Sequence, residues 1–178
     1  DKMISKIKSS AKQVVFRGNG PGKKIYSDYK DSIFYIYNPT AILEDEDEII
    51  QGVMGTGSLI DEKGLILTNA HVVENANQVW IYPGAKDASG KLVTEESNKF
   101  LSTVIAKDEK TDLALIKVVG LPKKIKLIPM ANIDDIFPGE VVFAIGHPET
   151  YFTWSISDGI VSAIRPNYKW MDKHVATM

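Results

Sequence analysis

A histidine and an aspartate stand at the edges of apolar strands and could together carry out acid–base chemistry. His71 follows shortly after the apolar residues 65–67, and Asp112 directly precedes the apolar residues 113–116. A carboxylate leading into a strand that is apolar on both faces is expected to be partly buried, which is costly without a hydrogen-bond donor. An imidazole N–H is a suitable donor, and the pairing would hold the histidine in one tautomer. The two residues therefore predict the base and orienting acid of a nucleophilic hydrolysis.

No serine in the chain has the setting of a nucleophile. Of the twelve serines none stands two residues after a glycine, and only Ser89 precedes a glycine. Ser58 is expected to hold a packing or ladder position in a strand. Ser155 and Ser157 fall in another strand region, which lacks the turn of backbone N–H groups that an oxyanion hole requires. The absence of cysteine excludes a thiol nucleophile, disulfides and thiolate metal sites.

Two apolar strands joined by a polar turn position His71. Residues 59–60 and 65–67 supply the strands, and residues 61–64 supply a hairpin turn in which Gly64 can take a positive φ. Further strands are predicted at residues 33–37, 79–82, 100–107, 113–119, 141–145 and 153–164. Short strands, little helix and frequent turn residues predict an antiparallel all-β architecture, either barrel or sandwich.

The segments between the strands define the expected organisation. Asn38 and Pro39 are expected to end the first strand. The other segments are a short helix at 2–15, a breaker-rich loop at 17–22, a solvated acidic loop at 44–48 and a polar loop at 83–98. A break near residues 120–128 suggests two units in tandem. The expected divisions are 1–25 for an N-terminal helix and loop, 26–122 for a first β-barrel and 123–178 for a partial second β-barrel.

Composition narrows the functional class. With 44% hydrophobic and 25% charged residues the chain is that of a soluble globular protein, and a net charge of −2 gives no reason to expect a nucleic-acid partner. No apolar run approaches the ~20 residues of a membrane span. The chain begins with neither a signal peptide nor an initiator methionine, which indicates a mature or trimmed product. No cofactor is predicted.

A metal site is disfavoured by the spacing of the histidines. His71, His147 and His174 include no pair with the His-x-x-x-His spacing of a zinc site. His147 is expected to be a turn residue before Pro148. A metal-binding protein that uses His71 and His147 is kept only as a third alternative.

Several blocks, in the same order, resemble the HtrA/Deg branch of the trypsin-like serine proteases. They are residues 55–60, 68–73, 111–117, 139–146 and 157–163. The resemblance implies two six-stranded β-barrels with the active site in the cleft between them, and a Ser-His-Asp triad. It also implies ATP-independent cleavage of misfolded or partner proteins, frequent homotrimers, often a following PDZ domain, and a location in the periplasm or cell envelope. Carried over by position, His71 is the general base and Asp112 its orienting acid.

The chain departs from this family at the nucleophile. The family's serine lies in a Gly-Asn-Ser-Gly-Gly segment that is absent here, and residues 174–178 resemble the strand that leads into it. We therefore expect a serine endopeptidase whose nucleophile segment lies outside the given chain, and we expect the 178-residue chain alone to be inactive. The alternative is a non-catalytic pseudoprotease that uses the fold as a protein-binding scaffold.

Overall fold

The computed structural model describes residues 20–45, 48–83, 98–122, 124–147 and 155–165. The helix predicted at 2–15, the strand expected at 174–178 and nearly all of the polar segment 83–98 lie outside the described residues. In chain order the elements are α2 (Pro21–Tyr29), the 3₁₀ helix η1 (Lys30–Ser32), β1 (Ile33–Asp45), β2 (Glu48–Leu59), β3 (Leu65–Thr68), the 3₁₀ helix η2 (His71–Val73), β4 (Gln78–Tyr82), β5 (Phe100–Asp108), β6 (Leu113–Lys117), the 3₁₀ helix η4 (Ile133–Asp135), β7 (Val141–Gly146) and β8 (Ser155–Ile160).

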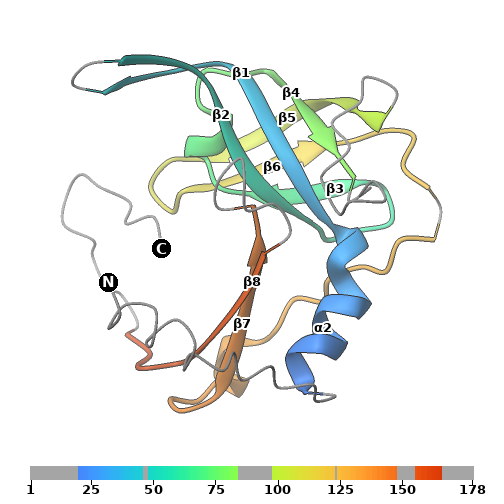
Figure 1. The fold of residues 1–178 in the computed structure, drawn as a ribbon, viewed down its shortest axis with the longest axis vertical. Coiled ribbons are helices and arrows are strands. Elements are labelled where there is room, and N and C mark those ends of the chain that lie inside the picture. Colours follow the sequence, from blue (N-terminus) through green and yellow to red (C-terminus); the bar gives the residue numbers. More distant parts are fainter. Residues whose placement is uncertain (1–19, 46–47, 84–97, 123, 148–154, 166–178) are drawn as a thin grey trace, which may run out of the picture.

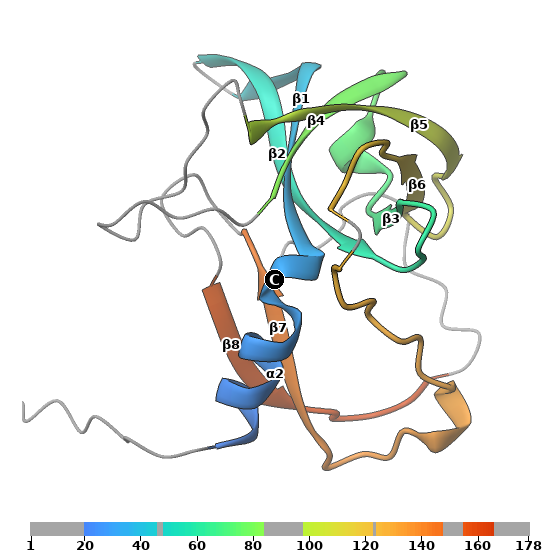
Figure 2. The same cartoon turned by 90° about the vertical axis from the view of Figure 1, so that its right-hand side faces the viewer.

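Strands β1 to β6 close into an antiparallel barrel in the order β1-β2-β3-β6-β5-β4 (Figure 1). The predicted all-β fold with a complete first barrel is confirmed. Strands β7 and β8 form a separate two-stranded sheet beside the barrel, next to helix α2 (Figure 2). Within the part of the chain that the structure describes, the second unit is therefore partial, as predicted. The division of the chain at residues 25 and 122 stays a prediction.

The barrel core is built from alternate residues of its strands. Five fully buried side chains come from four strands: Phe34, Ile36, Ile66, Ile81 and Ile116. Aromatic and β-branched residues suit a pleated strand with one buried face. Burial of each such side chain stabilises the fold by about 1.5–3 kcal/mol. The barrel is therefore a rigid support for the loops at its ends.

The hairpin that leads to His71 forms as predicted. Gly64 adopts a φ of +83°, which only glycine takes readily. The Asp61 carboxylate accepts a hydrogen bond of 2.8 Å from the backbone N–H of Leu65 and so closes the turn. The backbone N–H of Ile60 donates to the Leu65 carbonyl at 2.9 Å. This local chemistry sets the register of β3, which in turn places the loop that follows it.

The first strand is longer than the sequence predicts. An end at Asn38 and Pro39 is expected, but β1 continues past both residues with a shift in register. Asn38 faces Val53, whereas Ile42 faces Gln51, so β1 carries extra residues between these pairs. Proline cannot donate to a strand ladder, but a bulge absorbs the interruption and pairing then resumes. The predicted strand end is therefore wrong.

Residues 44, 45 and 48 of the acidic run belong to the same pair of strands. Asp45 and Glu48 face each other as strand partners, so a loop over the whole run is also wrong. The two strands extend beyond the rest of the barrel (Figure 1). Tertiary pairing here overrides the low strand propensity of acidic residues.

A helix occupies a segment where the sequence predicts only a loop. The breaker-rich loop expected at 17–22 overlaps α2, which begins at Pro21. Proline fits the first helical position because its missing N–H would have no partner in the helix. The Asp28 carboxylate accepts hydrogen bonds from Lys24 at 2.7 Å and from Lys126 at 3.1 Å. The second contact ties the helix to the segment that follows the first barrel.

Gly55 permits a close approach between β2 and the helix η2. A Cβ at this position would lie 2.5 Å from Cγ2 of Val72, the residue after His71. Substitution Gly55→Ala is therefore expected to lower the free energy of unfolding by about 1–3 kcal/mol through overpacking. Urea denaturation measures this change. Gly159→Ala is the matched control, because its Cβ would meet no heavy atom within 4 Å. An equal loss in both variants would contradict the packing role of Gly55.

Candidate active site

His71 opens the 3₁₀ helix η2, shortly after β3 ends at Thr68. The next two side chains, Val72 and Val73, are buried in the barrel core. The His71 side chain is 41% exposed. The two valines therefore anchor the short helix while the imidazole remains accessible to solvent.

Asp112 directly precedes β6 and is brought to His71 by strand pairing. Strands β3 and β6 are antiparallel neighbours, with Thr68 opposite Ala114. The end of β3 therefore meets the start of β6. Asp112 has a φ of +53°, a left-handed conformation in which aspartate is enriched. Its backbone carbonyl accepts a hydrogen bond from the N–H of Ala70 at 3.1 Å, which joins the two loops.

The Asp112 carboxylate accepts three hydrogen bonds at this junction. Its Oδ1 accepts from the His71 backbone N–H at 3.0 Å. Its Oδ2 lies 2.8 Å from His71 Nδ1 and accepts from Asn69 Nδ2 at 3.0 Å. The contact expected between His71 and Asp112 is therefore present. A carboxylate partner requires Nδ1 to carry the proton, so Nε2 of the neutral ring is an acceptor.

The environment keeps Asp112 ionised. Burial raises the pKa of the Asp112 carboxyl, since its side chain is only 18% exposed. The hydrogen bonds from the His71 backbone and ring, and from Asn69, outweigh burial and hold that pKa below its ordinary value. A charged carboxylate beside Nδ1 can stabilise an imidazolium that forms during a reaction. The pair can thus accept a proton at Nε2 and stabilise the product.

Asn69 is a residue of the site that sequence reasoning missed. Its Nδ2 donates both to Asp112 Oδ2 and to the Asp112 carbonyl, the latter at 3.1 Å. It therefore holds the backbone and the carboxylate of Asp112 together. Its position two residues before His71 in a loop after a strand is the signal that could have identified it.

His147 directly follows β7 and is buried. Its side chain is 3% exposed and makes an edge-to-face contact with Tyr35, with ring centroids 5.6 Å apart. Its backbone N–H donates to Thr56 Oγ1 at 2.8 Å, which connects the end of β7 to the barrel. No cluster of three or more His, Cys, Asp or Glu suitable for a metal ion occurs among the described residues.

Three serines that were considered as nucleophiles, Ser58, Ser155 and Ser157, lie within strands. Ser58 lies in β2 opposite Ile33 and Leu67. Ser155 and Ser157 lie in β8, where Ser157 faces Ala144. A serine held in a ladder lacks the turn of N–H groups that would stabilise an oxyanion. These positions agree with the structural roles expected for them.

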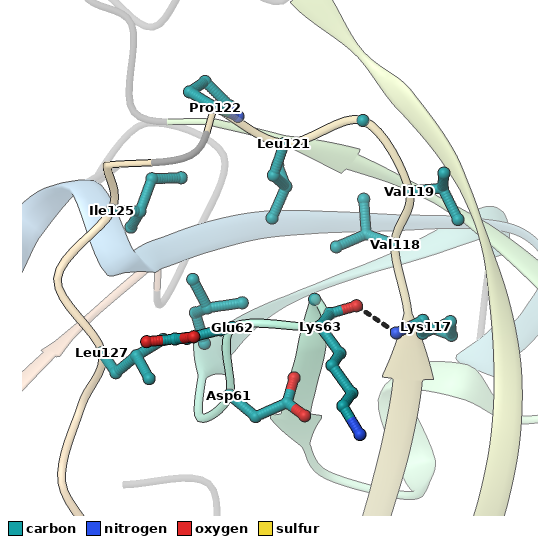
Figure 3. Close-up of a pocket in the computed structure, with 13 residues that line it drawn as sticks. Asp61, Glu62, Lys63, Lys117, Val118, Val119, Leu121, Pro122, Ile125 and Leu127 are labelled. Carbon is teal, nitrogen blue, oxygen red and sulfur yellow. Dashed lines mark hydrogen bonds between the residues drawn. The ribbon is translucent and has the colours of Figure 1, made fainter.

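A pocket of ≈ 790 Å³ lies at the other end of β3 and β6 from the His71–Asp112 pair. Residues 61–64 and 117–122 line it together with Leu59, Ile125 and Leu127 (Figure 3). Two of the lining residues contact each other, since Lys117 Nζ donates to the Lys63 carbonyl. Neither His71 nor Asp112 contributes to the lining, so this pocket is separate from the candidate active site.

Comparison with protein families identifies the family to which this chain belongs. The model of the trypsin-like peptidase domain matches residues 55–177, a stretch that includes both His71 and Asp112. The chain belongs to this family. Relatives such as DegS and DegP place this trypsin-like domain in the HtrA/Deg branch, as the sequence motifs predict.

Three relatives illustrate the similarity. The serine endoprotease DegS of Haemophilus influenzae is 30% identical over 76% of this chain and 37% of its own length. The periplasmic serine endoprotease DegP of Escherichia coli is 34% identical over 62% of this chain and 21% of its own length. The serine protease HTRA1A of Danio rerio is 36% identical over 61% of this chain and 20% of its own length. The trypsin-like domain thus spans well under two thirds of each of these relatives.

The described helices do not include one that could cross a bilayer. None of them combines the length and the apolar composition that a membrane span needs.

Proposed function

We propose that this trypsin-like domain belongs to a serine endopeptidase of the Ser-His-Asp type, with His71 as general base and Asp112 as orienting acid. The contact of 2.8 Å between His71 Nδ1 and Asp112 Oδ2 carries the proposal, because it leaves Nε2 as the accepting atom. The family match supports the reaction class. The nucleophilic serine is proposed to lie in a segment outside residues 1–178.

In the proposed reaction, His71 Nε2 accepts a proton and then donates it, once in acylation and once in deacylation. Nε2 takes the proton of the serine hydroxyl as its oxygen attacks the peptide carbonyl, and the resulting imidazolium gives that proton to the leaving amine. A water molecule then attacks the acyl intermediate while Nε2 takes its proton, and the imidazolium gives that proton to the serine oxygen as the ester bond breaks. Asp112 stays ionised throughout and stabilises the imidazolium through Nδ1–H, while Asn69 and the His71 N–H hold the carboxylate in place. The oxyanion hole would come from the nucleophile segment.

Misfolded or partner proteins are the proposed substrates, in a role in protein quality control. The names of DegS, DegP and HTRA1A as serine proteases or endoproteases support polypeptide substrates. The periplasmic location in the name of DegP supports an extracytoplasmic location in the periplasm or cell envelope. A homotrimer and a following PDZ domain are further proposals that rest on the family resemblance alone.

Labelling with a fluorophosphonate tests this function directly. The probe reacts covalently with a serine activated by a triad. We expect the complete protein to be labelled at one serine beyond residue 178, within a Gly-Asn-Ser-Gly-Gly segment. We expect the 178-residue chain alone to remain unlabelled and without hydrolytic activity. Labelling of a serine within residues 1–178 would contradict the assignment. A complete protein that is not labelled and has another residue in place of the nucleophilic serine would favour the pseudoprotease.

A further inference from the structure

Asn38 is a polar side chain on the core face of β1. Phe34, Ile36 and Asn38 alternate along the strand and all are 0% exposed. The first two positions hold apolar residues of the barrel core, so an apolar residue would be expected at the third. A buried amide is costly unless it is hydrogen-bonded. The Asn38 amide at this position therefore needs hydrogen-bond partners inside the protein.

The Asn38 carboxamide uses its full hydrogen-bonding capacity. Its Nδ2 donates to the carbonyl of Val72 at 3.1 Å and to the carbonyl of Glu74 at 2.9 Å. Its Oδ1 accepts from the N–H of Thr40 at 3.0 Å and from the Thr40 hydroxyl at 2.7 Å. Two donors and two acceptor sites are all that an amide offers. A flipped amide would aim its oxygen at two carbonyls, so only one orientation is compatible with these partners.

The two carbonyls held by Asn38 belong to the segment that carries His71. The helix η2 spans only His71–Val73, and Glu74 is its C-terminal cap. A helix this short leaves most of its carbonyls without partners of its own. Asn38 binds two of them from the β1 side, while Asp112 binds the His71 N–H and ring from the β6 side. The segment is thus clamped between two strands of the barrel.

The bulge in β1 explains how Asn38 reaches η2. Asn38 is the last residue before the register shift, and Pro39 follows it. On the opposing strand, Gly52 has a φ of +96° that suits the irregular pairing. Bulges occur next to active sites, where they redirect a side chain or end a ladder. Here the bulge also brings Thr40 back onto the Asn38 amide oxygen.

We infer that Asn38 is a positioning residue for His71: its amide fixes the turn of η2 so that the imidazole meets Asp112. The expected effect of Asn38 on catalysis rests on the proposed function, whereas its role in holding η2 in place does not depend on that function. Removal of the two N–H donors would free the Val72 and Glu74 carbonyls and let η2 move. A displacement of about 1 Å at a catalytic group can reduce a rate by about 100-fold.

Two variants of the complete protein remove the N–H donors of Asn38 to different extents. Asn38→Thr retains one hydroxyl donor, and Asn38→Ala retains none. We expect kcat for casein cleavage to fall about tenfold and about 100-fold respectively, with KM changed by less than about twofold. Thr40→Val is the matched control, because it removes a bond to the same amide but leaves both contacts to η2. Its kcat should stay within about twofold of the unmodified protein. Each variant is assayed below its own thermal transition.

Two NMR measurements test the positioning without catalysis. In the unmodified protein the side-chain amide protons of Asn38 should exchange slowly with solvent. In Asn38→Thr, the ¹³Cγ signal of Asp112 should titrate at a higher pH, because the donors from His71 are displaced. Thr40→Val should leave that titration unchanged.

The outcomes separate this inference from the proposed function. Fast exchange of the Asn38 amide, or folded Asn38 variants with an unchanged kcat and an unchanged Asp112 titration, would overturn the positioning role. An equal loss of kcat in Thr40→Val would also overturn it, because loss of stability would then explain the effect. If His71→Ala left proteolysis intact, the proposed function would fail, and the NMR measurements would still decide whether Asn38 holds η2.

Discussion

Substitution His71→Ala is expected to reduce kcat for casein cleavage by the complete protein by about 10⁵- to 10⁶-fold. Alanine removes the Nε2 acceptor, so neither proton transfer in the proposed reaction has a carrier. The side chain is half-exposed and is not part of the barrel core, whereas Val72 and Val73 supply the core contacts of η2. Thermal stability should therefore change little. Release of acid-soluble peptides from casein measures the loss.

Glu74→Ala serves as the control for this result. Glu74 is exposed and caps the same helix, and alanine leaves intact the backbone carbonyl that binds Asn38. We expect cleavage to be unchanged in this variant. Cleavage that survives His71→Ala at the level of the unmodified protein would exclude His71 as the base and would leave the His71–Asp112 pair as a purely structural contact.

Asp112→Asn is expected to lower kcat by about 10⁴-fold with little change in backbone geometry. Asparagine also tolerates the left-handed φ of +53° found at this position. With its oxygen retained toward the His71 N–H, its new NH₂ group would face the two donors His71 Nδ1 and Asn69 Nδ2. The imidazole would have to become an acceptor at Nδ1, which puts the proton on Nε2. The ring could then no longer accept the serine proton.

The same substitution should change how stability depends on pH. The Asp112 pKa is held below its ordinary value in the folded state, so the folded chain favours the ionised form. This stabilisation is complete above the unfolded-state pKa of about 3.9 and is lost as the pH falls through the folded pKa. Asp112→Asn should therefore destabilise the fold more at pH 7 than at about pH 3. Urea denaturation at both values measures the difference.

Asp108→Asn is the control for the effect of Asp112→Asn on kcat. Asp108 ends β5 and is exposed, and its carboxylate accepts from the Lys110 N–H at 3.0 Å. Hydrogen bonds from Thr111 and Lys110 also lower the pKa of Asp108. Within the part of the chain that the structure describes, Asp108 forms no hydrogen bond or ion pair with His71. We expect kcat to be unchanged in this variant. An equal loss of kcat in Asp108→Asn would show that a general electrostatic effect, rather than the Asp112 contact, governs catalysis.

Local patterns in the sequence were sufficient for the hairpin and for most of the barrel strands. The turn ending at Gly64 needs only a short carboxylate and a residue that tolerates positive φ, and both are visible in the sequence. Strand β3 follows from a short apolar run after the turn, and β4 follows from a run of β-branched and aromatic residues. The expected partial burial of Asp112 also followed locally, because its neighbours are apolar.

Other features depended on residues distant in the chain. Helix α2 was missed because its first turn contains proline and glycine, which signal a loop when neighbouring segments are unknown. The extension of β1 was missed because Pro39 stops an isolated ladder, whereas the pairing of Ile42 with Gln51 restores it. Asn69 was missed because its partner lies 43 residues further along the chain.

The sequence by itself determined the two residues that we propose to carry the chemistry, a histidine and a partly buried aspartate, because apolar neighbours and turn residues act over short distances. Only the tertiary structure decided how these residues are held. Strand pairing brings the end of β3 to the start of β6, and a bulge in β1 brings Asn38 to the carbonyls of η2. Hydrogen bonds between such distant segments depend on register and closure of the barrel, which no local pattern encodes.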